Sequence, residues 1–323
     1  MSTLPVTLQD IRVARQRIAD HIRRTPMEAD PHLPNVILKC EYRQETGAFK
    51  LRGATNAVLS LSDPGRRAGV ITASTGNHGR ALAYAARAVG TRATVCLSQL
   101  VPDNKITAIR DLGADVRVIG ASQDEAMEEV SRAVAREGMT RVDPFDDPAV
   151  IAGQGTIGLE ILEDCPAPDA ILVPLSGGGL ASGIAIAVKA RRPQARVIGV
   201  SMDRGAAMAA SLDAGHPVDV TEGPSLADSL GGGIGLQNRV TFPICQALLD
   251  DVILVTEGEI AEAMRHLAHI GHVVEGAAVV GHAAILAGKF SPKGPTVTIL
   301  SGGNVDQALH ARIIAGANSV EAA

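Results

Sequence analysis

Aromatic residues are almost missing from this chain of 323 residues, which has no tryptophan, two tyrosines and four phenylalanines. Because hydrophobic residues are still 46% of the chain, the core must be built from small and aliphatic side chains. Basic runs interleaved with aromatic residues are also absent, and the formal net charge is −5. This composition argues against a nucleic acid partner.

Cysteines and long apolar runs are scarce as well. The four cysteines are far apart and form no CxxC pair: Cys40, Cys96, Cys165 and Cys245. This spacing indicates reduced thiols rather than a disulfide framework or a zinc site. No apolar run approaches the ~18–20 residues that a membrane span needs, and the N-terminus lacks a signal-peptide pattern. We therefore expect a cytoplasmic protein with no membrane segment.

What the chain does have is an alternation of short apolar runs and helical patterns. Strand-type runs are followed by helices in the first half, and the pattern restarts after Pro148. Such alternation is typical of βαβ units and parallel sheets. The expected strands are 36–40, 69–74, 94–97, 116–119, 170–174, 197–200, 252–255 and 296–300. The expected helices include 6–23, 81–89, 124–136, 154–162 and 180–189. Two α/β units in one chain fit this pattern best.

The segment Glu45–Ala54 places Lys50 directly behind Phe49 and a small residue, with Arg52 and Gly53 following. A lysine held among apolar neighbours loses its proton more readily, because desolvation disfavours the ammonium form. A neutral amine is what a Schiff base with an aldehyde cofactor requires. The alternative is an ordinary surface lysine at the start of a helix.

A glycine-rich turn, Leu175–Leu180, lies between an expected strand and an expected helix. Its three consecutive glycines allow backbone N–H groups to converge on an anion, and the helix N-terminus adds its dipole. The spacing matches neither a Walker loop nor the dinucleotide-binding pattern GxGxxG. The turn therefore indicates a site for a monophosphate, with a simple tight turn as the alternative.

Two more segments combine polar side chains with strand ends. In Ala73–Gly79, hydroxyl and amide side chains and helix N-terminal amides make a site for a carboxylate. His78 in this segment is either a general base or a residue that orients the loop by hydrogen bonds. Leu300–Asn304 follows a buried strand and places Ser301 at its end, with a simple turn as the alternative.

Together these four segments resemble the fold-type II pyridoxal-phosphate enzymes, in the serine/threonine dehydratase and serine racemase branch. The resemblance covers nearly the whole chain and extends to the segments 102–105, 122–126 and 144–156. It implies an α/β fold like that of the tryptophan synthase β chain, with pyridoxal 5'-phosphate between two parallel-sheet domains. The large cofactor-binding domain would comprise residues 1–51 and 149–323, and the small domain residues 52–148. A homodimer is also implied.

The resemblance assigns roles to individual residues. Lys50 would bind the cofactor and move the substrate's α-proton, and Thr75 would be the second catalytic residue. The implied cofactor-binding residues are Phe49, Lys50, Asn77, Ser176, Gly177, Gly178, Gly179, Leu180, Glu275 and Ser301, with Gly232 near the ring. The implied substrate-binding residues are Ser74, Thr75, Gly76, His78 and Arg132. An uncharged serine facing the pyridine nitrogen makes the cofactor a weaker electron sink, which favours β-elimination over transamination.

Two departures from the family pattern stand out. Racemases of this family usually carry serine, and simple dehydratases alanine, at the position of Thr75, which is β-branched and stiff. Many relatives also bind a divalent cation through a glutamate and an aspartate, where this chain has Ser201 and Ala207. Hard cations need oxygen-rich sites, so we expect no metal there. Our hypothesis is that Arg204 supplies the missing positive charge.

The residues that flank these motifs resemble those of hydroxyectoine-utilisation dehydratases and bacterial β-hydroxyaspartate dehydratases. An acidic substrate requires cationic partners, and the candidates are Arg80, Arg132, Arg204, His266, His269 and His272. They favour 3-hydroxyaspartate, which would give iminosuccinate, then oxaloacetate and ammonia. The alternatives are a threonine/serine dehydratase, a hydroxyectoine-degradation dehydratase, an amino-acid racemase, or a protein that binds a phosphate ligand without catalysis.

Overall fold

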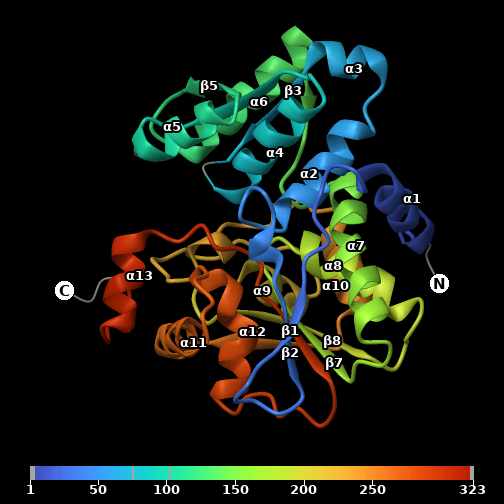
Figure 1. Ribbon diagram of the computed structural model, residues 1–323. Coiled ribbons are helices and arrows are strands. Elements are labelled where there is room, and N and C mark those ends of the chain that lie inside the picture. The colour runs from blue at the N-terminus through green and yellow to red at the C-terminus, as the bar shows by residue number, and fades with distance from the viewer. Residues whose placement is uncertain (1–3, 75, 102, 321–323) are drawn as a thin grey trace.

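The computed structural model describes residues 4–74, 76–101 and 103–320, and its strands form two separate sheets (Figure 1). The larger sheet has the order β1-β2-β10-β7-β8-β9, and only β1 is antiparallel to its neighbour. The smaller sheet has the order β5-β4-β3-β6 and is parallel throughout. The strands of the larger sheet are Met27–Ala29 (β1), Val36–Lys39 (β2), Ala170–Pro174 (β7), Arg196–Met202 (β8), Asp251–Val255 (β9) and Thr296–Ile299 (β10). The strands of the smaller sheet are Val70–Ala73 (β3), Ala93–Leu97 (β4), Asp115–Val118 (β5) and Thr140–Arg141 (β6).

Helices connect the strands in both units. In the first half of the chain they are Leu8–Ile18 (α1), Glu41–Arg43 (η1, a 3-10 turn), Lys50–Leu59 (α2), Asp63–Ala68 (α3), Asn77–Ala88 (α4), Asp103–Asp111 (α5), Gln123–Glu137 (α6) and Pro148–Asp164 (α7). In the second half they are Gly179–Lys189 (α8), Ala207–Ala214 (α9), Asp228–Leu230 (η2), Thr241–Leu248 (α10), Glu257–His269 (α11), Gly276–Leu286 (α12) and Gln307–Ile314 (α13). In Figure 1 the smaller sheet and helices α3–α6 lie above the larger sheet, with α2 at the junction.

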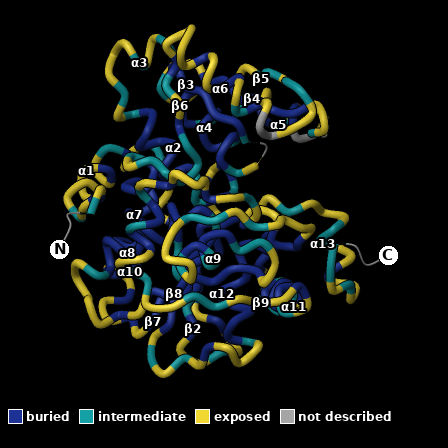
Figure 2. The backbone as a smooth tube through the Cα atoms, turned by 180° about the vertical axis from the view of Figure 1, so that it is seen from behind, coloured by how far each residue is buried: buried dark blue, intermediate teal, exposed yellow. Residues whose placement is uncertain are grey.

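The larger sheet is buried on both faces. Successive residues of a strand point to opposite faces, and in β7 Leu172 packs into the cluster formed with α11 and α12. Ile171 and Val173 pack into the cluster on the other face, which includes residues of α7, α8 and α10. Helix α8 is buried along nearly its whole length (Figure 2). This continuous burial explains why its sequence is almost entirely apolar.

The smaller sheet follows the same principle with fewer residues. Val70 and Val95 pack with α2, α4 and α5 on one face, while Ile71 and Cys96 pack with α6 on the other. Both faces are filled mainly by Ala, Val, Ile and Leu, with Cys96 and Met139 on the α6 side and Tyr84 at the edge of the other. The core therefore matches the composition-based expectation.

Strand order brings distant segments together. Strands β2, β10 and β7 are parallel neighbours, although they end at Lys39, Ile299 and Pro174. Their carboxyl ends therefore lie at one edge of the sheet, where ligands of open α/β sheets bind. An isolated bridge between Ala48 and Gly302 extends the pairing beyond β2 and β10. This edge collects three of the four segments that the sequence singled out.

The α/β fold with parallel sheets is confirmed, but several element boundaries differ. The helix expected at 6–23 is only Leu8–Ile18; its N-cap is Thr7, and Asp10 completes a capping box. Helix α4 begins at Asn77 rather than at Ala81, because Gly76 acts as its N-cap. The sequence patterns missed β1, β6, helix α3, and helices α9 to α13. The domain boundaries stay a prediction; the strands of the smaller sheet fall between Val70 and Arg141.

Two composition-based expectations can also be compared with the structure. The four cysteines are free and buried. Over the described part of the chain, no helix combines the length and the hydropathy that crossing a membrane would take.

Candidate active site

A cavity of about 680 Å³ is lined by residues from both α/β units. It contains most of the site residues expected from the sequence, namely Phe49, Lys50, Ser74, Gly76, Asn77, His78, Ser176, Gly177, Gly178, Gly179, Leu180, Gly232, Glu275 and Ser301. Thr75 lies outside the described residues. Arg132 does not line the cavity: it lies on α6, is half exposed, and pairs with Glu129.

Lys50 is the first residue of α2 and points its amine into the cavity wall. Its Nζ donates a hydrogen bond of 2.7 Å to the carbonyl oxygen of Pro144. Burial lowers the pKa of this amine to about 8, although the carboxyl of Glu275 acts in the opposite direction. A substantial share of the amine is therefore neutral, and nucleophilic, near physiological pH.

A buried group of charges fixes the start of α2. Arg52 is fully buried and donates to both oxygens of Glu41 at 2.8 Å, and to the two oxygens of Glu160 at 2.7 and 2.8 Å. Lys39 adds a hydrogen bond of 2.5 Å to Glu160. Two cations and two carboxylates balance one another, so each charge is compensated without water. No sequence pattern assigns this role to Arg52; the signal for it is an arginine two residues after Lys50 in an otherwise apolar helix start.

The turn after β7 is fixed by glycine conformation and close packing. Gly178 caps α8 with φ +88°, a conformation that favours glycine. A Cβ on Gly177 would lie 2.3 Å from the ring of Phe145, so only glycine fits beneath this ring. Residues 176–180 line the cavity, and the N-terminus of α8 begins among them. Such a helix start suits a phosphate group, and the phosphate site stays a prediction.

The turn after β3 is held by side-chain hydrogen bonds in addition to close backbone packing at Gly79. Asn77 Nδ2 donates to the carboxylate of Glu275 at 2.9 and 3.2 Å, and Asn77 Oδ1 accepts from Asn304 Nδ2 at 2.6 Å. Both partners belong to the larger unit. The asparagine therefore ties the two units together at the edge of the cavity, a contact that the sequence did not predict.

His78 is buried, and its Nε2 donates a hydrogen bond of 3.0 Å to the carbonyl oxygen of Val142. Burial, reinforced by the charge of Lys50, lowers the pKa of His78 to about 3. An imidazole that is neutral and so weakly basic is a poor proton acceptor at neutral pH. Of the two alternatives for His78, the geometry supports orientation of the loop.

Glu275 lies in the cavity wall, just before α12. Burial raises the pKa of its carboxyl to about 7, although the hydrogen bond from Asn77 acts in the opposite direction. A Cβ on Gly302 would lie 2.5 Å from Glu275 Oε1, so the loop after β10 passes directly beside this carboxyl. That loop is anchored by Phe49 N–H, which donates to the carbonyl oxygen of Ser301 at 2.9 Å.

Of the cationic candidates for substrate binding, some line the cavity and others lie outside it. Arg204 lines the cavity, together with Glu222 and Asp228, which the sequence analysis had not singled out. His266 and His272 instead bond to Asp30 and Tyr42 near the β1 strand. Like His269 and Arg80, they are not among the residues that line the cavity within the described part of the chain.

Other contributors to the site come from the segment 144–156, whose sequence was noted without an assigned role. Pro144 accepts the hydrogen bond of Lys50, and Phe145 covers Gly177. Asp146 accepts backbone hydrogen bonds at the start of α10, from Val240 at 3.0 Å and Thr241 at 2.8 Å. These contacts join α7 and α10 behind the anion site, and no local sequence pattern indicates them.

Comparison with known proteins adds independent findings. The profile of the family described as "Pyridoxal-phosphate dependent enzyme" matches residues 18–302. A protein of Sinorhizobium fredii named "Putative threonine dehydratase" is 58% identical over 318 residues, 96% of each chain. An L-threonine ammonia-lyase of Thermotoga maritima is 42% identical over 96% of this chain and 78% of its own length. The structure of maize serine racemase superposes with a TM-score of 0.89 at 33% identity, covering 94% of this chain and 95% of the racemase.

Proposed function

The chain belongs to the pyridoxal-phosphate dependent enzyme family, and from that premise we propose that it dehydrates and deaminates threonine or serine. The chain is a fold-type II lyase that uses pyridoxal 5'-phosphate. The observation that carries the choice of substrate is the similarity, along almost the whole chain, to relatives named as threonine dehydratase and L-threonine ammonia-lyase. This reverses the order expected from sequence motifs, which favoured 3-hydroxyaspartate.

The residues in the cavity fit the cofactor. The partly neutral amine of Lys50 suits its aldehyde, and the amides at the start of α8 suit its phosphate. Ser301 offers an uncharged hydroxyl at the end of β10 for the ring nitrogen. When bound, pyridoxal 5'-phosphate supplies an electron-accepting ring that stabilises negative charge at the substrate's α-carbon.

The chain's own residues then supply binding and proton movement. Ser74, Gly76 and the amides at the start of α4 suit the substrate carboxylate, and His78 holds this loop against Val142. The amine of Lys50, oriented by Pro144, takes the proton from the α-carbon. Loss of the β-hydroxyl as water, followed by hydrolysis, would convert threonine to 2-oxobutanoate and serine to pyruvate, each with ammonia.

Arg204 is the observation that keeps 3-hydroxyaspartate as a second candidate. Among the described residues that line the cavity, Arg204 is the one arginine. None of the ion pairs between described residues involves its guanidinium. A second substrate carboxylate would pair with this guanidinium. Arg132 lends no support to this candidate, because it pairs with Glu129 on α6, outside the cavity lining.

A substrate panel distinguishes the two candidates. Ammonia and keto-acid release would be followed for threonine, serine, both diastereomers of 3-hydroxyaspartate and a hydroxylated diaminobutyrate. We expect kcat/KM for threonine or serine to exceed the others by at least about tenfold. Dominant turnover of 3-hydroxyaspartate or of the diamine would overturn the proposal while leaving the reaction class intact.

The variant Arg204→Gln sharpens this test, with Arg67→Gln, an exposed arginine of α3, as its matched control. If threonine and serine are the substrates, both variants retain kcat/KM within about threefold. A selective loss in Arg204→Gln, confined to 3-hydroxyaspartate, would assign that arginine to the second carboxylate. Cofactor absorbance verifies that each variant is loaded.

We also propose a homodimer in the cytoplasm, supported by the family resemblance. Sedimentation equilibrium would give twice the chain mass of 33.3 kDa. A monomer with full activity would contradict the assembly while leaving the proposed reaction unaffected.

A further inference from the structure

A second group of chemically reactive side chains lies where β1 meets helices α11 and α12. Asp30 follows β1 directly, His266 belongs to α11, and His282 belongs to α12. A carboxylate oxygen of Asp30 and one nitrogen from each histidine lie within 4.8 Å of one another. None of the three lines the catalytic cavity described above.

Asp30 is positioned by the backbone. Its Oδ1 accepts hydrogen bonds from the N–H groups of His32 at 2.8 Å and Leu33 at 2.9 Å. Its Oδ2 is thereby left to face His266 Nε2 at 2.9 Å and His282 Nε2 at 3.3 Å. The side chain of Asp30 is fully buried. One carboxylate oxygen and two imidazole nitrogens therefore converge on one point.

The imidazole of His282 is buried and lacks hydrogen bonds to the described residues. Its side chain is 0% exposed, and neither ring nitrogen makes a hydrogen bond within the described part of the structure. The rest of α12 is Gly, Ala, Val, Ile and Leu, so His282 is the one polar side chain of this helix. Its Nε2 has only the contact of 3.3 Å with Asp30, and its buried Nδ1 has no hydrogen-bond partner in the described residues. A buried polar atom without a hydrogen bond is unfavourable and calls for an explanation, such as an ion bound nearby.

We propose that Asp30, His266 and His282 form a binding site for a divalent transition metal of the Zn²⁺ type. Two imidazoles and one carboxylate are a donor set that suits Zn²⁺. Bonds of about 2.0–2.2 Å in a tetrahedron place ligand atoms about 3.4 Å apart. The separations of 2.9 and 3.3 Å come close to this value, so small side-chain movements complete the site.

The fourth position of the tetrahedron faces the exposed side of the group. His266 is 17% exposed and lies beside the ring of His32, with centroids 5.9 Å apart. His32 in turn lies near His269, and both are exposed. A metal would enter from this side and retain a water molecule as its fourth ligand. Its role would be structural, joining the N-terminal strand to the two helices that cover one face of the larger sheet.

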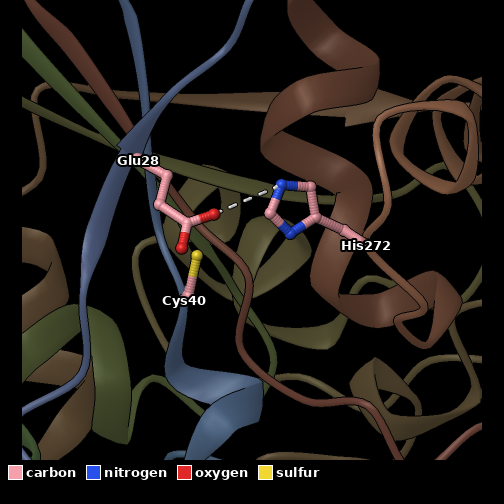
Figure 3. A group of neighbouring side chains, drawn as sticks. All are labelled: Glu28, Cys40 and His272. Carbon is pink, nitrogen blue, oxygen red and sulfur yellow. Dashed lines mark ion pairs between the residues drawn. The ribbon is translucent and has the colours of Figure 1, made fainter.

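A neighbouring group, Glu28, Cys40 and His272, is a weaker candidate (Figure 3). Figure 3 shows its three side chains pointing toward one another, with Glu28 paired to His272. Glu28 is also paired with Arg43 at 2.5 Å, and that positive charge repels a cation. His272 already bonds to Tyr42 through Nδ1 at 3.0 Å. Each side chain of this group has a hydrogen bond or an ion pair, whereas neither ring nitrogen of His282 has a hydrogen bond among the described residues.

The test is zinc binding to the cofactor-loaded enzyme after chelator treatment, followed by metal analysis and calorimetry. We expect one Zn²⁺ per chain and a rise in Tm of about 5 °C at saturating metal. Asp30→Asn and His282→Gln should each weaken binding at least tenfold and abolish the rise in Tm. His216→Gln, an exposed histidine beyond α9, is the matched control and should bind as the wild type does.

Three results would overturn the proposal. Binding that is absent or below one equivalent in the wild type is the first. The second is binding that survives in His282→Gln and in the part-exposed variant His266→Gln but is lost in His269→Gln, which would indicate a surface histidine pair. The third is a sulfur-to-metal charge-transfer band with Co²⁺ that Cys40→Ala removes, which would place the ion in the neighbouring group. Retained cofactor absorbance shows that each variant is folded, so every result applies to the site.

Discussion

The two glycine-containing turns at the cavity are built differently, although each joins a parallel strand to a helix. The turn after β7 is held by packing: Gly178 has φ +88°, and Phe145 fills the space over Gly177. The turn after β3 is held by polar side chains, with Asn77 bonded to Glu275 and Asn304 and His78 bonded to Val142. The first turn is fixed by close packing, whereas the second also depends on side-chain hydrogen bonds to Glu275 and Asn304.

This difference matches what each turn would bind. A phosphate that stays in place through the reaction is best held by fixed backbone amides. A substrate that enters and leaves needs a loop whose anchors can be exchanged, and side-chain hydrogen bonds are easier to exchange than close packing. If the turn after β7 holds the phosphate and the turn after β3 holds the substrate, substitutions in the two turns should have different effects.

The largest effect is expected for Lys50→Ala, which removes the amine that lies in the cavity with both turns. Ammonia release should fall at least ~10³-fold, because no other group replaces the proton acceptor. The turn after β7 is untouched, so the variant should still bind pyridoxal 5'-phosphate reversibly, as equilibrium dialysis would measure. Lys293→Ala, an exposed lysine, serves as the control. Retained activity in Lys50→Ala would remove the basis of the proposed site.

The next effect concerns Glu275, the partner of Asn77 across the cavity. Burial raises the pKa of its carboxyl from 4.5 to about 7, so the folded state prefers the protonated form. The protonated carboxyl of Glu275 makes its full contribution to stability below pH ~4.5. As the pH rises through 7 this contribution is lost, and the free energy of unfolding falls by roughly 3 kcal/mol. Glu275→Gln should remove this loss. Urea unfolding of the cofactor-free wild type and Glu275→Gln between pH 4 and 8 would measure this loss of unfolding free energy. If the two proteins lose the same free energy as the pH rises, Glu275 is not its cause.

A smaller effect is expected at the turn after β3. A Cβ on Gly79 would lie 2.3 Å from the carbonyl oxygen of Ser74, whereas a Cβ on Gly76 meets nothing within 4 Å. Gly79→Ala should therefore lower the free energy of unfolding by about 1–3 kcal/mol and raise KM. Gly76→Ala is the matched control for stability. Equal stability of the two variants would mean that the loop adapts without strain.

The smallest effect is expected at the turn after β7. Gly178→Ala places a side chain at φ +88° and 2.8 Å from Met208, so the amides of α8 should shift. Affinity for pyridoxal 5'-phosphate should fall at least about tenfold, with kcat on the loaded enzyme nearly unchanged. Gly215→Ala has a similar φ of +76° with open space around it, and should leave cofactor affinity intact. A drop in both variants would point to general destabilisation.

Much of the fold was predictable because its signals are local. The apolar strands and the glycine turns depend on residues close together in the chain, and the structure has them where the patterns indicated. Helices α9 to α13 were missed. Helix α12 shows why: it is apolar on all sides and carries no period to detect.

The site was predictable only in part, because only some of its residues stand in local motifs. Lys50, Ser176–Gly179 and Ser301 stand in motifs, and the cavity unites them. The partnership of Asn77 with Glu275 spans 198 positions, and that of His282 with Asp30 joins opposite ends of the chain. No periodicity or spacing encodes such pairs.

The sequence by itself determined the alternation of strands and helices, the glycines at the turns and the lysine behind a phenylalanine. These follow from backbone sterics and side-chain polarity within a few residues. The tertiary structure alone decided which charges are buried and which pKa values move. It seats the amine of Lys50 against Pro144, buries Glu275 beside Asn77, and leaves Arg132 on the surface of α6. Desolvation and long-range pairing exist only once distant segments have packed, because they depend on what surrounds a group and not on what precedes it in the chain.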